Sequence, residues 1–335
     1  MRLGLTLTGD QLTMADIVRF ACQAEEAGFD SVWVTEAWRE AFVPLTAIAM
    51  QTNRVRIGTA IALTMARSPV LMELAATAVD EIAQGRLILG IGPGPKAWNE
   101  NWHAVRFYPP AAYVREYAEV LRLMWTAHSG KSVDYQGKYL QIREYQRFSR
   151  PYRDQIPIYF GAVMPKFLRV TGAVADGLCV AACNTPRYIA DVARHYMAEG
   201  MQESQREAGT VGCMSLVICA VDTDREKARH RAKQQIAFYT TFPYYDIVLD
   251  QHDLAEEKTR IREAWARNDT TGMVAGVSEQ MVDLISIAGT PQECRQALSR
   301  YEGIVDEVSL YSPSFELSRE EVLTNHGAIL EAFGR

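Results

Sequence analysis

The chain has 335 residues, 48% hydrophobic and 23% charged, which is an ordinary composition for a soluble globular protein. Its formal net charge of −6 at pH 7, without a block of like charges, argues against a nucleic-acid partner. No apolar run reaches the ~18 residues of a membrane span, and residues 1–5 enter a strand-like pattern rather than a signal peptide, so we expect a cytoplasmic protein with no membrane partner.

A short apolar run followed by an amphipathic helix recurs along most of the chain, which predicts parallel strands joined by crossover helices, an α/β fold. The predicted helices cover residues 14–27, 44–51, 69–84, 110–128, 165–175, 186–206 and 290–302, and a further one starts at 224. The eight predicted strands cover residues 2–8, 31–36, 55–63, 86–92, 156–162, 177–181, 211–221 and 305–311. Eight such strands close economically into a (β/α)8 TIM barrel, and an open doubly wound sheet is the alternative.

Two segments interrupt this alternation of strands and helices, one after the fourth strand and one after the seventh. Residues 131–142 alternate polar and apolar side chains around Gln136-Gly137, which predicts a hairpin. Residues 238–279 hold a cluster of Tyr, Phe and Pro and then charged helical sequence, which we interpret as a second insertion. Neither segment resembles a linker, so residues 1–335 are predicted to form a single domain.

The cysteines show no pattern of a metal site or a redox motif. Cys179 and Cys183 lie four residues apart, Cys213 and Cys219 six apart, and no histidine stands at metal-ligand spacing from them. We predict reduced cysteines packed mainly in the core, and no metal.

The loop after the fourth strand is rich in glycine and proline. In barrels of this kind the chemistry lies at the C-terminal ends of the strands. Gly90-Ile-Gly-Pro-Gly-Pro95 departs from a dinucleotide-binding fingerprint because proline stands at position 95 and no helix pattern is evident after it. We interpret it as a rigid loop that lets a planar ligand approach the backbone, with a plain turn as the alternative.

The loop after the fifth strand is the second candidate. In Phe160-Gly-Ala-Val-Met-Pro165 the small residues leave the backbone bare, and Pro165 marks the start of a helix. The free N–H groups of a helix N-terminus bind phosphate, and Lys166 would add a positive charge. An ordinary strand–helix connection is the alternative.

Several segments, in this order and spacing, resemble the luciferase-like (alkanal monooxygenase-type) flavin and deazaflavin oxidoreductases. They are most similar to the branch that uses coenzyme F420, which includes methylenetetrahydromethanopterin reductase and sugar-phosphate dehydrogenases. The matching residues are 24–36, 54–60, 68–69, 80–94, 156–162, 175–177 and 287–291.

The resemblance implies an F420-dependent oxidoreductase that moves hydride between the deazaflavin and a small organic substrate of C=N, C=C or C–OH type. An FMN-dependent monooxygenase of the same fold is the alternative. It also implies a non-prolyl cis peptide in the third strand, here Ala60–Ile61, that backs the cofactor ring, and a phosphate site at the fifth strand end. The expected cofactor-binding residues are Thr6, Glu36, Ala60, Ile61, Gly92, Pro93, Gly94, Asn99, Gly161, Ala162, Val163 and Met164.

The end of the second strand departs from the family pattern. Glu36 keeps the acid found there, but Ala37 stands where many members have histidine, and Pro95 stands where the sugar-phosphate enzymes have glutamate. Sugar-phosphate dehydrogenation is therefore disfavoured. Glu36 is the predicted catalytic acid, with an ion pair to Arg39 or Arg67 as the alternative.

Aromatic residues near the strand ends are the predicted substrate-binding residues: Trp38, Trp98, Trp102 and Tyr244. For Trp98 and Trp102, simple loop packing is the alternative. Schiff-base aldolases and metal hydrolases are disfavoured, because the sixth strand has no lysine and the first has no metal ligands. A barrel that stores or binds the cofactor without catalysis is the non-enzymatic alternative. The resemblance also implies a homodimer.

Overall fold

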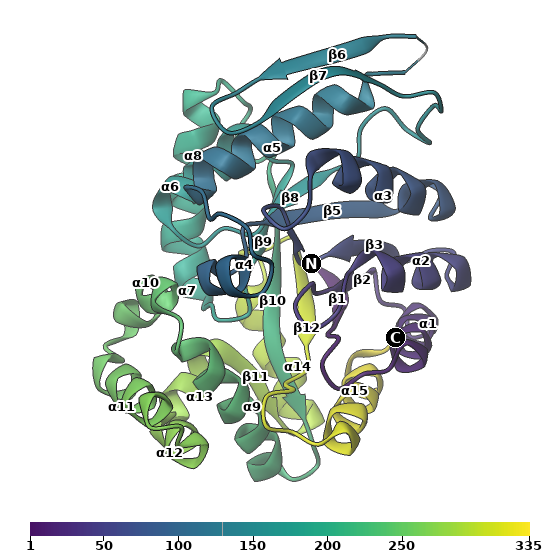
Figure 1. Ribbon diagram of the computed structural model, residues 1–335. Helices are drawn as coiled ribbons and strands as arrows, with labels where there is room; N and C mark the ends of the chain where they lie inside the picture. The colour runs from purple at the N-terminus through teal and green to yellow at the C-terminus, as the bar shows by residue number, and fades with distance from the viewer. Residues whose placement is uncertain (129) are drawn as a thin grey trace. The chain divides into compact units, whose positions relative to one another are not determined.

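The computed structural model describes residues 1–128 and 130–335 (Figure 1). The chain divides into two compact units. Unit 1 comprises residues 1–32, 180–195 and 213–335, and unit 2 comprises residues 33–179 and 196–212.

The sheet of unit 1 contains four parallel strands in the order β11-β10-β12-β1. The long strand β10 (Gly212–Val221) pairs with β12 (Glu307–Tyr311) along Met214–Ile218 and with β11 (Ser286–Gly289) along Ile218–Val221. On its other edge β12 pairs with β1 (Arg2–Leu7). Residues 213–221 are all buried, as expected for an apolar strand that is covered on both faces.

The sheet of unit 2 follows the order β2-β3-β5-β8-β9, and its central pairings are parallel. Strand β2 begins in unit 1 and ends in unit 2. The strands are β2 (Ser31–Val34), β3 (Arg56–Thr59), β5 (Leu87–Gly92), β8 (Ile158–Phe160) and β9 (Gly177–Val180). The short strand β4 (Ala62–Leu63) continues the line of β3 and pairs with the end of β5.

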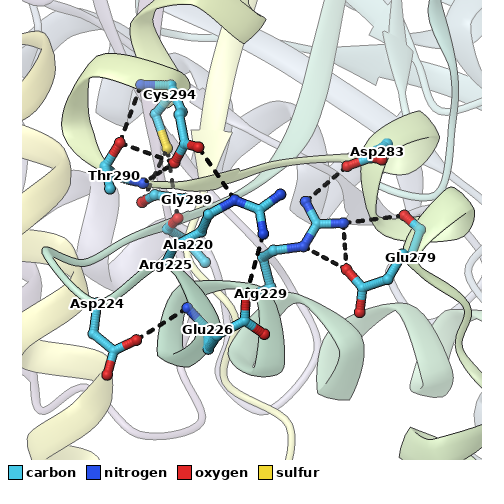
Figure 2. Close-up of polar contacts among 11 residues, drawn as sticks. Ala220, Asp224, Arg225, Glu226, Arg229, Glu279, Asp283, Gly289, Thr290 and Cys294 are labelled. Atoms are coloured by element: carbon cyan, nitrogen blue, oxygen red, sulfur yellow. Dashed lines mark hydrogen bonds and ion pairs between the residues drawn. The ribbon is translucent and has the colours of Figure 1, made fainter.

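The helices of unit 1 start where the sequence supplies caps. Thr13 and Asp16 form a capping box at α1, as do Thr290 and Glu293 at α14. The helices are α1 (Met14–Glu26), α7 (Pro186–Tyr188), α9 (Arg225–Thr240), α10 (Asp246–Leu249), α11 (Ala255–Ala266), α12 (Thr270–Gly276), α13 (Glu279–Ile285), α14 (Pro291–Leu298) and α15 (Arg319–Phe333). Figure 2 shows the ion pairs of Arg229 in α9 with Glu279 and Asp283 of α13. Arg225 of α9 also pairs with Glu293 of α14.

Proline occupies the first turn of three helices of unit 2, where its missing N–H costs no hydrogen bond. Helix α8 (Arg194–Glu203) has residues in both units. The helices of unit 2 are α2 (Phe42–Gln51), α3 (Pro69–Ile82), α4 (Lys96–Asn101), α5 (Pro110–Trp125) and α6 (Pro165–Val174). The antiparallel hairpin of β6 (Ser132–Gln136) and β7 (Gln141–Gln146) packs on α5 (Figure 1).

All eight predicted strands are present, the hairpin is confirmed, and it extends to Gln146. Residues 241–279 are largely helical. The sequence shows no strong helix pattern after Pro95, but the six-residue helix α4 starts at Lys96. The helix predicted over 186–206 is instead α7, a π-helical turn at Ile189–Ala193, and α8.

The six cysteines are free, and all but the half-buried Cys22 are buried, which agrees with the expected core packing. Across the described residues, no helix is both long enough and apolar enough to cross a membrane.

The buried histidine of α15 makes the stability of the protein depend on pH. His326 stacks on Phe20 with ring centres 4.8 Å apart, and its Nδ1 donates to the carbonyl of Val322 at 2.8 Å. Burial lowers the pKa of His326 to about 4. His326 is therefore protonated near pH 6.5 in the unfolded chain but stays neutral in the folded protein until about pH 4. Its contribution to the unfolding free energy is full above pH 6.5 and is lost as pH falls toward 4.

Replacing His326 by phenylalanine, which keeps the ring but does not titrate, is expected to remove this pH dependence. Between pH 7 and pH 5 the wild type should lose about 2 kcal/mol more unfolding free energy than His326→Phe. Urea denaturation at the two pH values measures the difference, and His103→Asn, at an exposed loop position, is the control. Equal losses in the wild type and His326→Phe would contradict this assignment.

Candidate active site

The third predicted strand of the chain, which lies in unit 2, is interrupted at the predicted position. The peptide bond Ala60–Ile61 is cis, as expected, and lies between β3 and β4. The N–H of Ala60 donates to the carbonyl of Val34 at 2.8 Å, so the break is tied to the end of β2.

The glycines of the two candidate loops pack against this break. A Cβ atom added at Gly92 would lie 2.9 Å from Cδ1 of Ile61, and one at Gly161 would lie 3.1 Å from its Cγ2. Gly94 has φ +65°, and a Cβ atom there would lie 2.5 Å from Cδ2 of Leu63. The bare backbone therefore makes room for Ile61 and Leu63, in addition to any role toward a ligand.

Asn99 holds the loop after β5 in shape. Its side-chain Nδ2 donates to the carbonyls of Pro93 at 2.7 Å and Pro95 at 2.9 Å, and its own carbonyl accepts from the N–H of Val105 at 3.0 Å. Asn99 is fully buried, and its Oδ1 atom accepts no hydrogen bond from the described residues. A buried acceptor without a donor is costly, which marks this atom as a place for a ligand N–H.

Glu36 is held by the segment that follows the cis bond. Its Oε2 accepts from the N–H of Leu63 at 2.7 Å, and its Oε1 accepts from Arg67 at 2.6 Å. Arg67 also pairs with Glu40 at 2.8 Å, and the hydroxyl of Tyr117 donates to the carbonyl of Arg67 at 2.9 Å. Of the two arginines considered as partners, Arg67 is thus paired with Glu36, and both carboxylate oxygens are engaged.

Three tryptophans form a cluster that we call the tryptophan plate: Trp38 after β2, and Trp98 and Trp102 at α4. Trp98 and Trp102 are stacked with ring centres 4.7 Å apart, and Trp38 lies 5.4 Å and 5.6 Å from them. Trp38 and Trp102 remain 53% and 54% exposed. The plate therefore combines mutual packing with a large apolar surface open to solvent, which is unusual for an ordinary loop.

The N-terminus of α6 lacks a side-chain cap. Met164 is the N-cap residue, Pro165 follows it, and the N–H groups of Phe167 and Leu168 both donate to the carbonyl of Met164. Ala162 is buried, Val163 is half-buried and Met164 is 48% exposed. Within the described part of the chain, the N-cap residue therefore places no side-chain hydrogen bond on the positive end of this helix.

Two of the predicted site residues, Thr6 and Tyr244, belong to unit 1. Thr6 is fully buried and shares a 2.6 Å hydrogen bond with Ser309. Tyr244 is 37% exposed and packs in an aromatic cluster with Phe242 and Tyr245, at ring distances of 5.5 Å and 4.6 Å. Burial raises the pKa of the Tyr244 hydroxyl, which keeps that group neutral at physiological pH.

A family model of luciferase-like monooxygenases matches residues 1–307. The chain belongs to the luciferase-like monooxygenase family. Its relatives include the 5,10-methylenetetrahydromethanopterin reductase of Methanopyrus kandleri, 30% identical over 287 residues that span 80% of each chain. The reductase of the same name from Archaeoglobus fulgidus is 28% identical over 88% of this chain and 87% of its own.

Solved structures agree with this membership. The coenzyme F420 dependent tetrahydromethanopterin reductase of Methanopyrus kandleri superimposes with a TM-score of 0.84 at 26% identity and covers 99% of both chains. An F420-dependent secondary alcohol dehydrogenase matches the fold with a TM-score of 0.76 at 20% identity, over 100% of this chain and 99% of that one. The predicted (β/α)8 barrel is thereby confirmed as the fold class.

In this luciferase-like protein, two residues that hold segments of the candidate site in place, Tyr117 and Thr59, were not predicted from the sequence. Tyr117 lies 50 residues from Arg67 in the chain, so no local pattern links the two. Thr59 donates its hydroxyl to the carbonyl of Gly90 at 2.5 Å and joins the break in the third strand to β5. The signal that was available for Thr59 is its place directly before Ala60–Ile61, the bond expected to be cis.

Proposed function

We propose that the protein is an oxidoreductase that uses coenzyme F420 to transfer hydride to or from a small organic substrate. The observation that carries the proposal is the likeness to an F420-dependent reductase over 99% of both chains. Relatives named methylenetetrahydromethanopterin reductase support the same chemistry. The proposed substrate is a small organic compound of the C=N, C=C or C–OH type.

The described residues of unit 2 fit such a cofactor. The unpartnered Oδ1 of Asn99 would accept a ring N–H, and the uncapped start of α6 at Val163 and Met164 would receive the phosphate. Ile61, fixed between Gly92 and Gly161, would back the ring. The deazaflavin itself supplies the hydride-carrying carbon, so the chain has to provide position and electrostatics. We propose the remaining predicted residues of unit 2 as further contacts. Thr6 of unit 1 stays a cofactor-binding residue predicted from the resemblance.

Glu36 fits a positioning role better than that of a proton donor, because its oxygens hold Leu63 and Arg67. In Glu36→Gln the bond to Leu63 can persist while the charge opposite Arg67 is lost. We expect F420 to bind about tenfold more weakly, with turnover at saturating cofactor changed far less. Fluorescence titration and steady-state kinetics separate the two effects. A loss of turnover of about 10²-fold or more at unchanged affinity would instead make Glu36 the acid.

For the substrate we propose the tryptophan plate of unit 2 as an apolar wall. Tyr244 of unit 1 stays a substrate-binding residue predicted from the sequence. The test of the function is turnover of reduced F420 with a panel of imines and enones, and of oxidised F420 with secondary alcohols, followed by absorbance. Turnover on any compound supports an enzyme. Binding of F420 without turnover across the whole panel would favour the storage barrel instead.

A homodimer remains a prediction by resemblance. Light scattering behind size-exclusion chromatography is expected to give twice the mass of the chain. A monomer at micromolar concentration would contradict it.

A further inference from the structure

A cavity of about 370 Å³ in unit 2 is lined by none of the residues of the site described above. Two segments line it, the loop that precedes α5 and the turn of the β6–β7 hairpin. Its volume lies within the range of small-ligand pockets, about 300–1,000 Å³. The lining residues are Arg106, Phe107, Tyr108, Pro109, Lys138 and Tyr139.

Aromatic rings hold both cations of this cavity. The guanidinium of Arg106 lies 5.2 Å from the ring centre of Tyr108, and the ammonium of Lys138 lies 5.4 Å from that of Tyr139. The two rings are 5.5 Å apart, and Tyr108 is stacked on Tyr113 at 5.1 Å. Cation–π contacts of this kind restrain long side chains that would otherwise sample many rotamers, so the positive charges are placed in advance of any ligand.

Neither Arg106 nor Lys138 forms an ion pair with any residue that the structure describes. In unit 1, by contrast, the cavity along α9 has cations such as Arg229, which is paired with Glu279 and Asp283 (Figure 2). Glu116 of α5 lies at the hairpin turn, but its oxygens accept from the backbone N–H groups of residues 138–140 at 2.9–3.1 Å. The two cations therefore keep charge to offer to an anion from solution.

We propose that this cavity binds an acidic group with two or more negative charges, held by Arg106 and Lys138 against the rings of Phe107 and Tyr139. Such a group has two sources, a free polyanion or the acidic tail of coenzyme F420. The second source rests on the proposed function, and the first does not.

The test compares three probes on the full-length protein at low ionic strength: F420, the deazaflavin chromophore without its acidic tail, and inorganic pyrophosphate. The double variant Arg106→Gln/Lys138→Gln is set against Lys131→Gln/Arg143→Gln, which removes the same charge from exposed positions near and on the same hairpin that do not line the cavity. Deazaflavin fluorescence and isothermal titration give the dissociation constants.

The cavity variant is expected to bind F420 about five- to tenfold more weakly, with the tail-free chromophore and the control variant unchanged. Loss of pyrophosphate binding with unchanged F420 affinity would also support the site and would make a free polyanion its ligand. Equal weakening of F420 and the tail-free chromophore, or no change with any probe, would overturn the proposal. If the wild type binds neither deazaflavin, the proposed function fails, and the pyrophosphate titration decides this inference alone.

Discussion

Arg147→Met is expected to lower the free energy of unfolding by about 3–5 kcal/mol. Arg147 forms an ion pair with Glu73 of α3, and the two side chains are 5% and 0% exposed. The hydroxyl of Tyr145 donates to the other Glu73 oxygen at 2.6 Å, and that of Thr77 donates to the paired one at 3.0 Å. Without Arg147, the buried carboxylate loses its counter-charge in a medium that does not solvate it. Urea denaturation at pH 7 measures the loss.

The matched control removes both charges at once. Glu73→Leu/Arg147→Met leaves no buried ion behind, so its unfolding free energy should lie within about 2 kcal/mol of the wild type. Two results would contradict this account. One is a loss of unfolding free energy under about 1 kcal/mol in Arg147→Met, and the other is an equal loss in the single and the double variant. Either would show that the ion pair does not stabilise the packing of the hairpin end on α3.

Gly90→Ala is expected to destabilise unit 2 by about 3 kcal/mol or more and to weaken F420 binding together with it. A Cβ atom at position 90 would lie 1.9 Å from the carbonyl oxygen of Thr59, a backbone atom that cannot move without parting β3 from β5. Because Thr59 directly precedes the Ala60–Ile61 bond, the displacement would reach the segment proposed to back the cofactor ring. Denaturation and F420 titration on the same preparation measure both effects.

Gly327→Ala is the control for this substitution. Gly327 lies inside α15, where an added Cβ atom would meet nothing within 4 Å. Alanine there should raise the unfolding free energy by about 0.5–1 kcal/mol through helix propensity. If Gly90→Ala behaves like Gly327→Ala, the close packing of β3 against β5 does not constrain this position.

The strands were predictable because parallel strands buried on both faces are continuous apolar runs, as in residues 213–221 of β10. Strand β11 was missed because its four residues, Ser286–Gly289, are too short to stand out. Helix α15 was missed because Asn325 and His326 interrupt its apolar face. Both are buried, and Asn325 bonds to Val221, Cys219 and Ser312, partners that no local pattern reveals.

The candidate site likewise has features that could be predicted from the sequence and features that could not. The resemblance placed the cis bond at Ala60–Ile61 correctly, and the glycines at 92 and 161 were visible in the sequence. What fills the space beside those glycines, the side chain of Ile61, depends on contacts 31 and 100 residues apart along the chain. The sequence also left Glu36 with two possible partners, and the structure pairs it with Arg67, which follows β4.

The cofactor is the central claim, and direct titration of the purified protein with F420 and, separately, with FMN tests it first. The account predicts saturable, micromolar or tighter binding of F420 and much weaker binding of FMN, since the described start of α6 offers the exposed Lys166 but no arginine to an FMN phosphate. Tight binding of FMN with no binding of F420 would contradict the account and would place the protein with the monooxygenases of its family.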